Sequence, residues 1–363
     1  MRMAAFRRRW ANAALSWFPM RTVQAFAPGR VNLIGEHTDY NAGLALPFAL
    51  AEGVTVRASA LDESRVHAIA LDLGESDVFS LDAIEPASGW RAFVRGTVAE
   101  LSRRAPGLGG ARLEITGSVP RGGGLGSSGA LGVALGLALG ALAGSVHSDG
   151  VELAKACARV ENVWVGARSG LLDQLAALFS EREHALAIDF RSLAIRPVTL
   201  QLEGYRLVLL DSGERHANAA LGYNQRRAEC DQACAVLGIA SLRDARVGDL
   251  ERLPARLADR ARHVLEENAR VEQAIEALER RDPVALGQLL VASHESSRDL
   301  YELSTPAVEA AVERLRQAGA VGARLVGGGF GGHILGLMPP GTELPPDAFE
   351  VRASGGARVV VAE

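Results

Sequence analysis

The hydrophobic positions along the chain follow two different periods, which predicts a mixture of strands and helices. Apolar or alternating runs typical of strands occur at Val54–Ala58, Leu113–Ile115, Ala185–Phe190 and Arg206–Leu210. Segments with helical spacing lie between them, but strands and helices do not alternate strictly. This arrangement favours an α+β fold over a parallel sheet with crossover helices.

Three of the helical segments are predicted by different signals. In Val151–Val165, apolar side chains recur at three- and four-residue spacing. Leu257–Leu278 has apolar residues among many glutamates and arginines, which predicts a long helix facing solvent. At Thr305–Pro306 a threonine cap is followed by a proline in the first turn, and Gly319 ends that helix.

The segment Gly129–Val146 has no charged residue and approaches the lower limit of transmembrane length. It is mostly alanine and glycine, which gain little from contact with lipid. Glycine recurs at every fourth position, so one face lacks side chains and allows close approach to a neighbouring element. We predict a buried helix of a soluble protein here, with a membrane span as the alternative.

The composition limits the possible partners of the chain. With 363 residues and a net charge of −4, it has room for two domains and no positive field that would attract nucleic acid. Lys155 is the only lysine, so a phosphate site must use backbone N–H groups, helix ends and arginine. Cys157, Cys230 and Cys234 cannot form a disulfide framework, and we expect a reducing, cytoplasmic location.

The first 21 residues contain arginines interleaved with apolar residues and no acidic residue. They are interpreted as a targeting or membrane-surface segment, as a poorly ordered extension, or as residues upstream of a true start at Met20. We favour the poorly ordered extension. Residues 22–196 and 197–363 are then predicted to form an N-terminal and a C-terminal domain.

A glycine-rich stretch at Pro120–Gly129 follows a predicted strand and opens the Gly/Ala helix. Its backbone can fold tightly around an anion, with free N–H groups at the helix start pointing toward it. The stretch also matches the dinucleotide pattern G-x-G-x-x-G, but no strand with an acidic end follows the helix, and a P-loop is excluded because the Walker lysine is missing. A glycine-rich turn without a ligand remains the alternative for this stretch alone.

Two further stretches carry candidate chemistry. Ala27–Gly43 contains Arg30, Glu36, His37 and Asp39 beside residues that we expect to be buried, so its polar groups suit binding of several sugar hydroxyls. Gly327–Gly332 lies between two apolar runs and predicts a hairpin whose bare backbone tip approaches another loop or a ligand.

Together these stretches resemble the galactokinases of the GHMP kinase superfamily. The galactokinase signature G-R-V-N-L-I-G-E-H-T-D-Y-N-G-G matches Gly29–Gly43 except at Ala42. Four later stretches also resemble the family, and the resemblance runs from about Ala27 to the C-terminus. These stretches are Trp90–Gly96, Glu161–Gln174, Tyr223–Cys230 and His294–Asp299. The resemblance implies a two-lobed fold, with an N-terminal lobe like ribosomal protein S5 domain 2, a ferredoxin-like C-terminal lobe and the active site between them.

The resemblance also implies a role for each matching residue. Asp173 faces the anomeric hydroxyl, as base or as orienting carboxylate, with Arg30 beside it as the second catalytic residue. Ser128 and Glu161 hold Mg²⁺. The sugar is bound by Glu36, His37, Asp39, Gly170 and Tyr223. ATP is bound by Gly122, Gly123, Gly124, Leu125, Gly126, Ser127, Ser128 and Gly129, with Trp90 on the adenine side.

The implied reaction is ATP-dependent phosphorylation of galactose to galactose 1-phosphate, by a monomer with no membrane or nucleic-acid partner. The sequence departs from the family near the sugar site, where Arg168–Ser169 replaces Pro-Cys, and at Gly126, Arg121 and His333. Arg168 favours a related sugar as an alternative substrate, such as N-acetylgalactosamine, arabinose or a uronic acid. A galactokinase-like sensor without catalysis is the third hypothesis.

Overall fold

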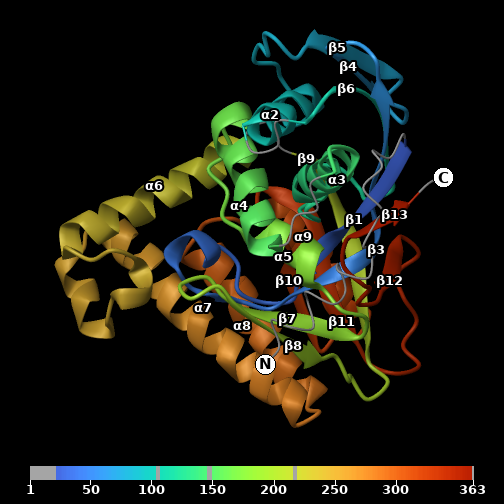
Figure 1. Cartoon of the computed structure of the whole chain (residues 1–363). Coiled ribbons are helices and arrows are strands. Elements are labelled where there is room, and N and C mark those ends of the chain that lie inside the picture. Colours follow the sequence, from blue (N-terminus) through green and yellow to red (C-terminus); the bar gives the residue numbers. More distant parts are fainter. Residues whose placement is uncertain (1–21, 104–106, 145–148, 216–218, 362–363) are drawn as a thin grey trace.

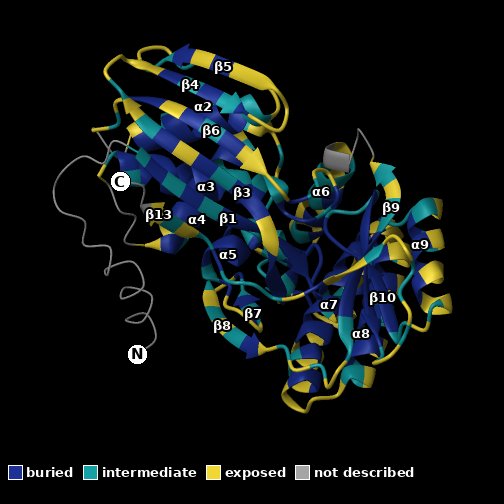
Figure 2. Cartoon of the chain, turned by 90° about the vertical axis from the view of Figure 1, so that its right-hand side faces the viewer, coloured by how far each residue is buried: buried dark blue, intermediate teal, exposed yellow. Residues whose placement is uncertain are grey.

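The computed structural model describes residues 22–103, 107–144, 149–215 and 219–361. The predicted extension at residues 1–21 lies outside the described residues. The described chain forms two lobes, each built on a β-sheet with helices packed against it (Figure 1; Figure 2). Most strand pairs are antiparallel, and helices and strands are mixed. The α+β class expected from the sequence is therefore confirmed.

The first lobe contains a six-stranded sheet in the order β13–β1–β3–β6–β4–β5. Only β4 and β6 pair in parallel. In sheet order the strands are Arg358–Val361, Thr22–Asn32, Pro47–Leu61, Gly110–Gly117, Arg65–Ala70 and Glu75–Ser80. The strands predicted at Val54–Ala58 and Leu113–Ile115 lie within β3 and β6.

Helix α3 (Ser127–Leu142) occupies the centre of the first lobe, between the sheet and the other helices. It is surrounded by α2 (Trp90–Ser102), α4 (Gly150–Val160) and α5 (Leu172–Phe179). A Cβ on Gly136 would lie 2.8 Å from Leu153 Cδ1, so the glycine face packs closely against α4. The predicted buried helix is confirmed, and no helix among the described residues has the length and apolarity to cross a membrane.

The helix predicted at Val151–Val165 changes its geometry part of the way along. Helix α4 ends at Val160 and continues as a π-helical turn over Glu161–Val165. The turn places Glu161 in the interior while Val163 is exposed to solvent. Such π-helical insertions often occur at functional sites.

The second lobe contains a four-stranded antiparallel sheet in the order β10–β11–β9–β12. In that order the strands are Gly322–Leu325, Gly331–Met338, Arg206–Arg215 and Ala348–Val351. Helices α8 (Pro283–Asp299) and α9 (Pro306–Gln317) pack against this sheet. The hydroxyl of Thr305 accepts a hydrogen bond from the Val308 N–H, which confirms the predicted N-terminal cap of α9.

Two long helices complete the second lobe, α6 (Ala219–Leu237) and α7 (Ala255–Glu279). The helix predicted at Leu257–Leu278 is confirmed, but the prediction that it faces solvent is wrong for one of its sides. That side buries Arg260, His263 and Glu267 together with apolar residues that belong to the cores of both lobes. The composition of α7 did not predict this buried side, because its buried charged residues form ion pairs within the protein.

A three-stranded sheet is formed by β2 (Leu44–Ala45), which precedes the helices of the first lobe, and by β7 (His184–Asp189) and β8 (Ala194–Thr199), which follow them. The chain then enters the second lobe and finally returns, because β13 pairs with β1 in the first sheet. The division into domains at residues 196 and 197 stays a prediction.

Candidate active site

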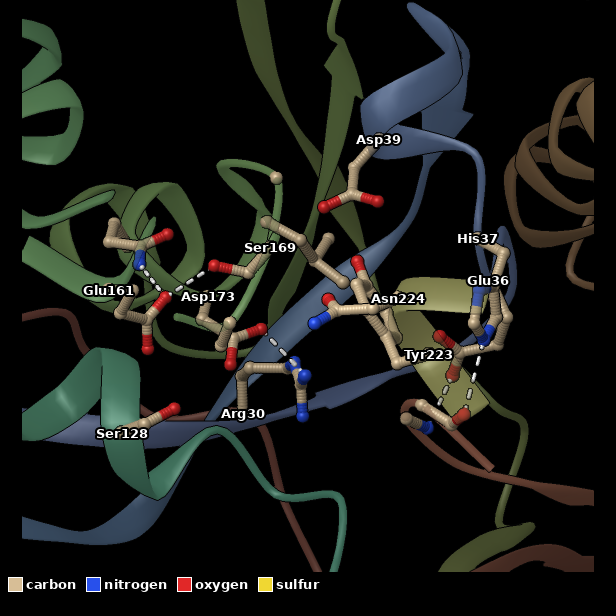
Figure 3. Close-up of a pocket in the computed structure, with 16 residues that line it drawn as sticks. Arg30, Glu36, His37, Asp39, Ser128, Glu161, Ser169, Asp173, Tyr223 and Asn224 are labelled. Carbon is tan, nitrogen blue, oxygen red and sulfur yellow. Dashed lines mark hydrogen bonds and ion pairs between the residues drawn. The ribbon is translucent and has the colours of Figure 1, made fainter. Parts of the chain in front are cut away.

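A pocket of about 200 Å³ is lined by residues of the three glycine-rich stretches, of α5 and α6, and of the segment between α4 and α5. Figure 3 shows Arg30 and Asp173 between Ser128 and Glu161 on one side and Glu36 and His37 on the other. The lining residues are Arg30, Glu36, His37, Asp39, Ser128, Glu161, Ala167, Ser169, Gly170, Leu172, Asp173, Gln174, Tyr223, Asn224, Gly327 and Gly328. The pocket therefore brings together most of the residues singled out in the sequence.

The second glycine stretch forms a loop that leads directly into α3. Gly122, Gly124 and Gly126 all have positive φ angles, of 66°, 75° and 71°, which glycine adopts without strain. The loop ends at the first turn of α3, where the N–H groups of a helix have no partner within the helix and carry partial positive charge. This geometry suits binding of a phosphate group.

The third glycine stretch is the connection between β10 and β11, as predicted, and packs against the phosphate loop. The His333 Nδ1 atom lies 2.8 Å from the Gly123 carbonyl oxygen, and the His333 backbone N–H donates to the same oxygen at 3.2 Å. A Cβ on Gly124 would overlap the carbonyl oxygen of Val326. Two backbones without side chains therefore meet here and fix the loop in place.

The first glycine stretch reaches the phosphate loop through Arg30. The Arg30 N–H donates to the Leu125 carbonyl oxygen at 2.9 Å, and its guanidinium donates to the Gly124 carbonyl oxygen. The guanidinium Nη2 lies 2.6 Å from Asp173 Oδ1. Burial disfavours the charge of Arg30, but the nearby Asp173 and Glu36 outweigh this and raise its pKa. Arg30 is thus a permanent cation beside Asp173.

Glu161 lies on the phosphate side of Asp173. Its Oε2 atom accepts hydrogen bonds from Ser169 Oγ at 2.7 Å and from Gln174 Nε2 at 2.8 Å. Burial and the neighbouring Asp173 raise its pKa, although hydrogen bonds from Ser169 and Ser128 oppose this. A buried carboxylate, Glu161, next to the partly exposed carboxylate of Asp173 forms a site that a cation would stabilise.

The fit of these residues to Mg²⁺ follows from their chemistry. Within the described part of the chain, no group of three or more His, Cys, Asp or Glu side chains is arranged to hold a metal. Mg²⁺, however, typically takes one or two carboxylates and completes its shell with water and substrate phosphates. Ser128 and Glu161 supply such oxygen donors at the start of α3, so they fit a magnesium ion that arrives with a nucleotide.

Glu36 lies on the opposite side of the pocket. Its carboxylate accepts the Gly327 N–H at 2.8 Å and lies 3.4 Å from Nη1 of Arg324, a fully buried arginine. Burial raises its pKa in spite of the attraction to Arg324 and Arg30. These contacts leave Glu36 fixed at the pocket wall.

His37 and Asp39 follow Glu36 along the same loop. The His37 Nδ1 atom lies 2.7 Å from the Tyr40 hydroxyl, and burial lowers the His37 pKa to about 3. Burial and the charge of Asp173 raise the pKa of Asp39 to about 6. A Cβ on Gly170 would overlap the Asp39 carboxylate, so the two residues are in direct contact. His37 is neutral, and Asp39 changes charge near neutral pH.

Tyr223 and Asn224 come from α6 and bring the second lobe to the pocket. The Tyr223 ring lies 5.0 Å from the His37 ring between centroids. Asn224 Oδ1 accepts the Arg168 N–H at 3.0 Å, and its amide donates to the Gly166 carbonyl oxygen at 3.2 Å. Asn224 was not among the residues predicted from the sequence, although it directly follows Tyr223 in the same motif. Ser169 and Gln174 were also missed.

Of the predicted ATP-binding residues, only Ser128 belongs to this pocket lining, and Gly122–Ser127, Gly129 and Trp90 lie outside it, as does Arg168. Trp90 begins α2, and its indole N–H donates to Glu75 at 2.9 Å. Its assignment to the adenine side stays a prediction. The Arg168 guanidinium lies 2.8 Å from Asp231 on the protein surface. The expectation that Arg168 favours a related sugar stays a prediction, although its side chain is paired with Asp231 in this structure.

Two side chains of α7 that hold the loop containing Glu36 and His37 were also missed. Glu267 of α7 accepts hydrogen bonds from the N–H groups of Gly35 at 2.9 Å and Glu36 at 3.4 Å. The neighbouring Asn268 accepts the Leu44 N–H at 2.8 Å. One helix of the second lobe therefore holds both ends of this loop, a relationship that no local sequence pattern reveals.

Three family models match the chain. The GHMP kinases N terminal domain matches residues 92–181, the galactokinase galactose-binding signature matches residues 18–60, and the GHMP kinases C terminal model matches residues 274–355. A galactokinase of Mycobacterium tuberculosis is 44% identical over 327 residues, with 88% of this chain and 89% of that protein covered. A galactokinase of Thermotoga petrophila is 39% identical over 316 residues, with 87% and 89% covered.

Solved structures agree with these matches. The Lactococcus lactis galactokinase complexed with galactose superimposes with a TM-score of 0.86 at 28% identity, covering 99% of this chain and 100% of that one. The Methanococcus jannaschii mevalonate kinase, at a TM-score of 0.64, 17% identity and coverage of 94% and 100%, shares the fold. The GHMP kinase fold implied by the sequence is thereby confirmed. By its identity to these relatives along most of its length, the chain belongs to the galactokinase family of the GHMP kinases.

Proposed function

We propose that the protein transfers the γ-phosphoryl group of ATP to the anomeric hydroxyl of galactose and releases galactose 1-phosphate and ADP. The observation that carries the proposal is the pair of Arg30 and Asp173, 2.6 Å apart between the phosphate loop and the signature loop of Glu36 and His37. A phosphate donor and a sugar acceptor would meet at this pair. Phosphoryl transfer depends mainly on such positioning and on neutralisation of charge.

Each residue has a defined part in this proposal. The carboxylate of Asp173 accepts a hydrogen bond from the anomeric hydroxyl, either to take its proton or to orient its oxygen. That oxygen forms a bond to the γ-phosphorus while the bond from phosphorus to the β–γ bridging oxygen breaks, and ADP leaves. The Arg30 cation stabilises negative charge on the transferring group. Glu36, His37, Asp39, Tyr223 and the backbone at Gly170 bind the remaining sugar hydroxyls.

The phosphate loop, Gly122 to Gly129, binds the triphosphate through its backbone N–H groups and the start of α3. Ser128 and Glu161 hold Mg²⁺, which supplies positive charge to the phosphates when bound. We also propose that the enzyme acts in the cytoplasm, because its three cysteines, Cys157, Cys230 and Cys234, are all free thiols.

An assay of ADP release with a panel of sugars tests the proposal. Galactose is expected to give the highest kcat/KM, ahead of N-acetylgalactosamine, arabinose and galacturonic acid, because Glu36, His37 and Asp39 of the matched galactose-binding signature line the pocket. If one of the other sugars gave a higher kcat/KM than galactose, that sugar would be the preferred substrate and the proposal of galactose would be wrong. Binding of ATP and galactose in calorimetry without any sugar phosphate formed would point to a sensor.

A further inference from the structure

A row of hydrogen-bonding groups leads from His37 away from the pocket into the second lobe. The Tyr40 hydroxyl lies 2.7 Å from His37 Nδ1 and 3.4 Å from the Tyr301 hydroxyl. The Tyr301 hydroxyl lies 2.9 Å from the Cys230 sulfur, and the Asn41 amide donates to that sulfur at 3.6 Å. At the opposite end, His37 Nε2 lies 3.3 Å from the Gly328 carbonyl oxygen.

The donor and the acceptor of each hydrogen bond in this row follow from the Gly328 carbonyl oxygen at one end. The Gly328 carbonyl oxygen can only accept, so His37 Nε2 carries the hydrogen. In a neutral imidazole, Nδ1 is then the acceptor and the Tyr40 hydroxyl must donate to it. Since Tyr40 has a single hydroxyl hydrogen, its oxygen accepts from Tyr301. The Tyr301 oxygen in turn accepts from the Cys230 S–H.

The charge states of the groups are consistent with this direction. Burial lowers the pKa of His37 to about 3, with the nearby His263 adding to the effect, so the ring is neutral. Burial raises the pKa of Cys230 to about 11, so the thiol keeps its hydrogen. Burial also raises the pKa values of Tyr40 and Tyr301 well above their ordinary value. All donors in the row therefore remain protonated at neutral pH.

Tyr301 is held rigidly in this row. Its side chain is fully buried, and its ring lies 4.3 Å from the His263 ring between centroids. The Arg226 Nε atom donates to the Tyr301 carbonyl oxygen at 2.6 Å. The backbone of His37 is held too, because the Asn41 amide donates to its carbonyl oxygen at 2.9 Å and keeps it at a φ angle of 59°. Tyr301 and His37, the two residues that the Tyr40 hydroxyl contacts, are thus each held by other groups.

We propose that Tyr40 is a positioning residue that holds His37 in the tautomer with hydrogen on Nε2, so that this N–H, whose contact with the Gly328 carbonyl oxygen is long at 3.3 Å, can be shared with a sugar oxygen at the pocket. This inference rests on the proposed function, since it assigns His37 to a sugar oxygen that accepts a hydrogen bond. Without the Tyr40 hydroxyl, Nδ1 loses its donor, so the preference for the Nε2–H tautomer rests on the long Gly328 contact alone and becomes weaker. Part of the protein population would then present the wrong nitrogen to the sugar.

The experiment compares wild type, Tyr40→Phe and a matched control, Tyr205→Phe, whose ring packs against the core of the first lobe. Long-range ¹H–¹⁵N spectra of protein labelled on histidine report each tautomer, and the resonances of His37 are assigned by their loss in His37→Gln. We expect an Nε2–H pattern for His37 in wild type and in Tyr205→Phe. In Tyr40→Phe we expect a mixture of tautomers.

Kinetics provide the second readout. Loss of one hydrogen bond changes an equilibrium constant by roughly 2- to 10-fold. We therefore expect the KM for galactose to rise by this factor in Tyr40→Phe. The kcat and the KM for ATP should stay within about twofold of wild type. If Tyr40→Phe does not fold, Tyr40→Leu removes the same hydroxyl and should change both readouts in the same direction, and an Nδ1–H pattern for His37 in wild type would by itself overturn the inference. An unchanged His37 tautomer in the variant that folds would overturn the inference. Failure of wild type to phosphorylate galactose would instead refute the proposed function, and the spectra would still decide the tautomer.

Discussion

Gly129 and Asp173 are in direct contact where the first turn of α3 meets the start of α5. A Cβ on Gly129 would overlap the Cβ of Asp173, and a Cβ on Gly126 would lie 3.3 Å from an oxygen of the same carboxylate. The phosphate loop and the aspartate therefore have no space between them. The short distance between the phosphate loop and the Asp173 carboxylate therefore depends on Gly126 and Gly129, and not only on the ion pair of Asp173 with Arg30.

Gly129→Ala is expected to move Asp173 away from Arg30 and lower kcat by roughly 100-fold, since small misplacements at a reacting centre are costly. The matched control is Gly132→Ala one turn along α3, where a Cβ would lie at an ordinary 3.5 Å from the Cys157 Cβ. The control should keep kcat within about twofold and stabilise the helix by up to about 1 kcal/mol. Equal activity of the two variants in the ADP-release assay would contradict the contact.

Glu161→Gln tests the magnesium site. The amide keeps the shape of the carboxylate but loses its charge, so the Mg²⁺ concentration for half-maximal activity should rise at least about tenfold. Glu152→Gln is the control, because Glu152 pairs with Lys155 on the exposed side of the preceding helix. Magnesium titrations at saturating ATP measure the effect, and curves that coincide for Glu161→Gln and wild type would remove Glu161 from the site.

The Asp39 pKa of about 6 predicts a pH dependence of sugar binding. The ionised carboxylate accepts hydrogen bonds from sugar hydroxyls, whereas below pH 6 most molecules hold a proton there. The dissociation constant for galactose should therefore rise by up to about tenfold from pH 7 to pH 5. Calorimetry across this range measures it. Burial also raises the pKa values of Glu36 and Glu161, so Asp39→Asn is needed for comparison. An identical pH profile in Asp39→Asn would assign the dependence to another group.

Ala42 has a φ angle of 53°, in the left-handed region where a side chain is strained. Glycine there removes the strain but adds freedom to the unfolded chain, so Ala42→Gly should raise the free energy of unfolding by about 0.5–1 kcal/mol. Ala258→Gly in α7 should instead lower it by about 1 kcal/mol. Urea unfolding of both variants checks the difference. Destabilisation by Ala42→Gly would show that the strain is absent.

Much of the fold could be predicted from local patterns along the chain. The uncharged Gly/Ala segment became the central helix α3, and the threonine and proline before α9 marked its start. The solvent-facing prediction for α7 failed because Arg260 pairs with Glu229 and Glu267 pairs with Arg270 inside the protein, which composition alone does not reveal. The π-helical turn after α4 was missed for a different reason. The spacing of apolar residues in a single π-helical turn differs little from that in an α-helix.

The candidate site was predictable where its residues share short motifs. Arg30, Glu36, His37 and Asp39 lie on one loop, and a single signature identified them. The groups that hold this loop, such as Glu267 and Tyr301, come from distant helices and loops and lack a local pattern. Long-range hydrogen bonds between lobes are set by packing, so only the structure reveals them.

The most direct test of the proposed reaction is the rate of galactose 1-phosphate formation by Asp173→Asn, followed by ³¹P NMR with ATP, Mg²⁺ and galactose. Asparagine keeps the size of the side chain but removes the negative charge beside Arg30. We predict that wild type forms the anomeric phosphate and that the variant is slower by at least about 1,000-fold while calorimetry still detects ATP binding. Formation of galactose 1-phosphate by Asp173→Asn at the wild-type rate would contradict the account.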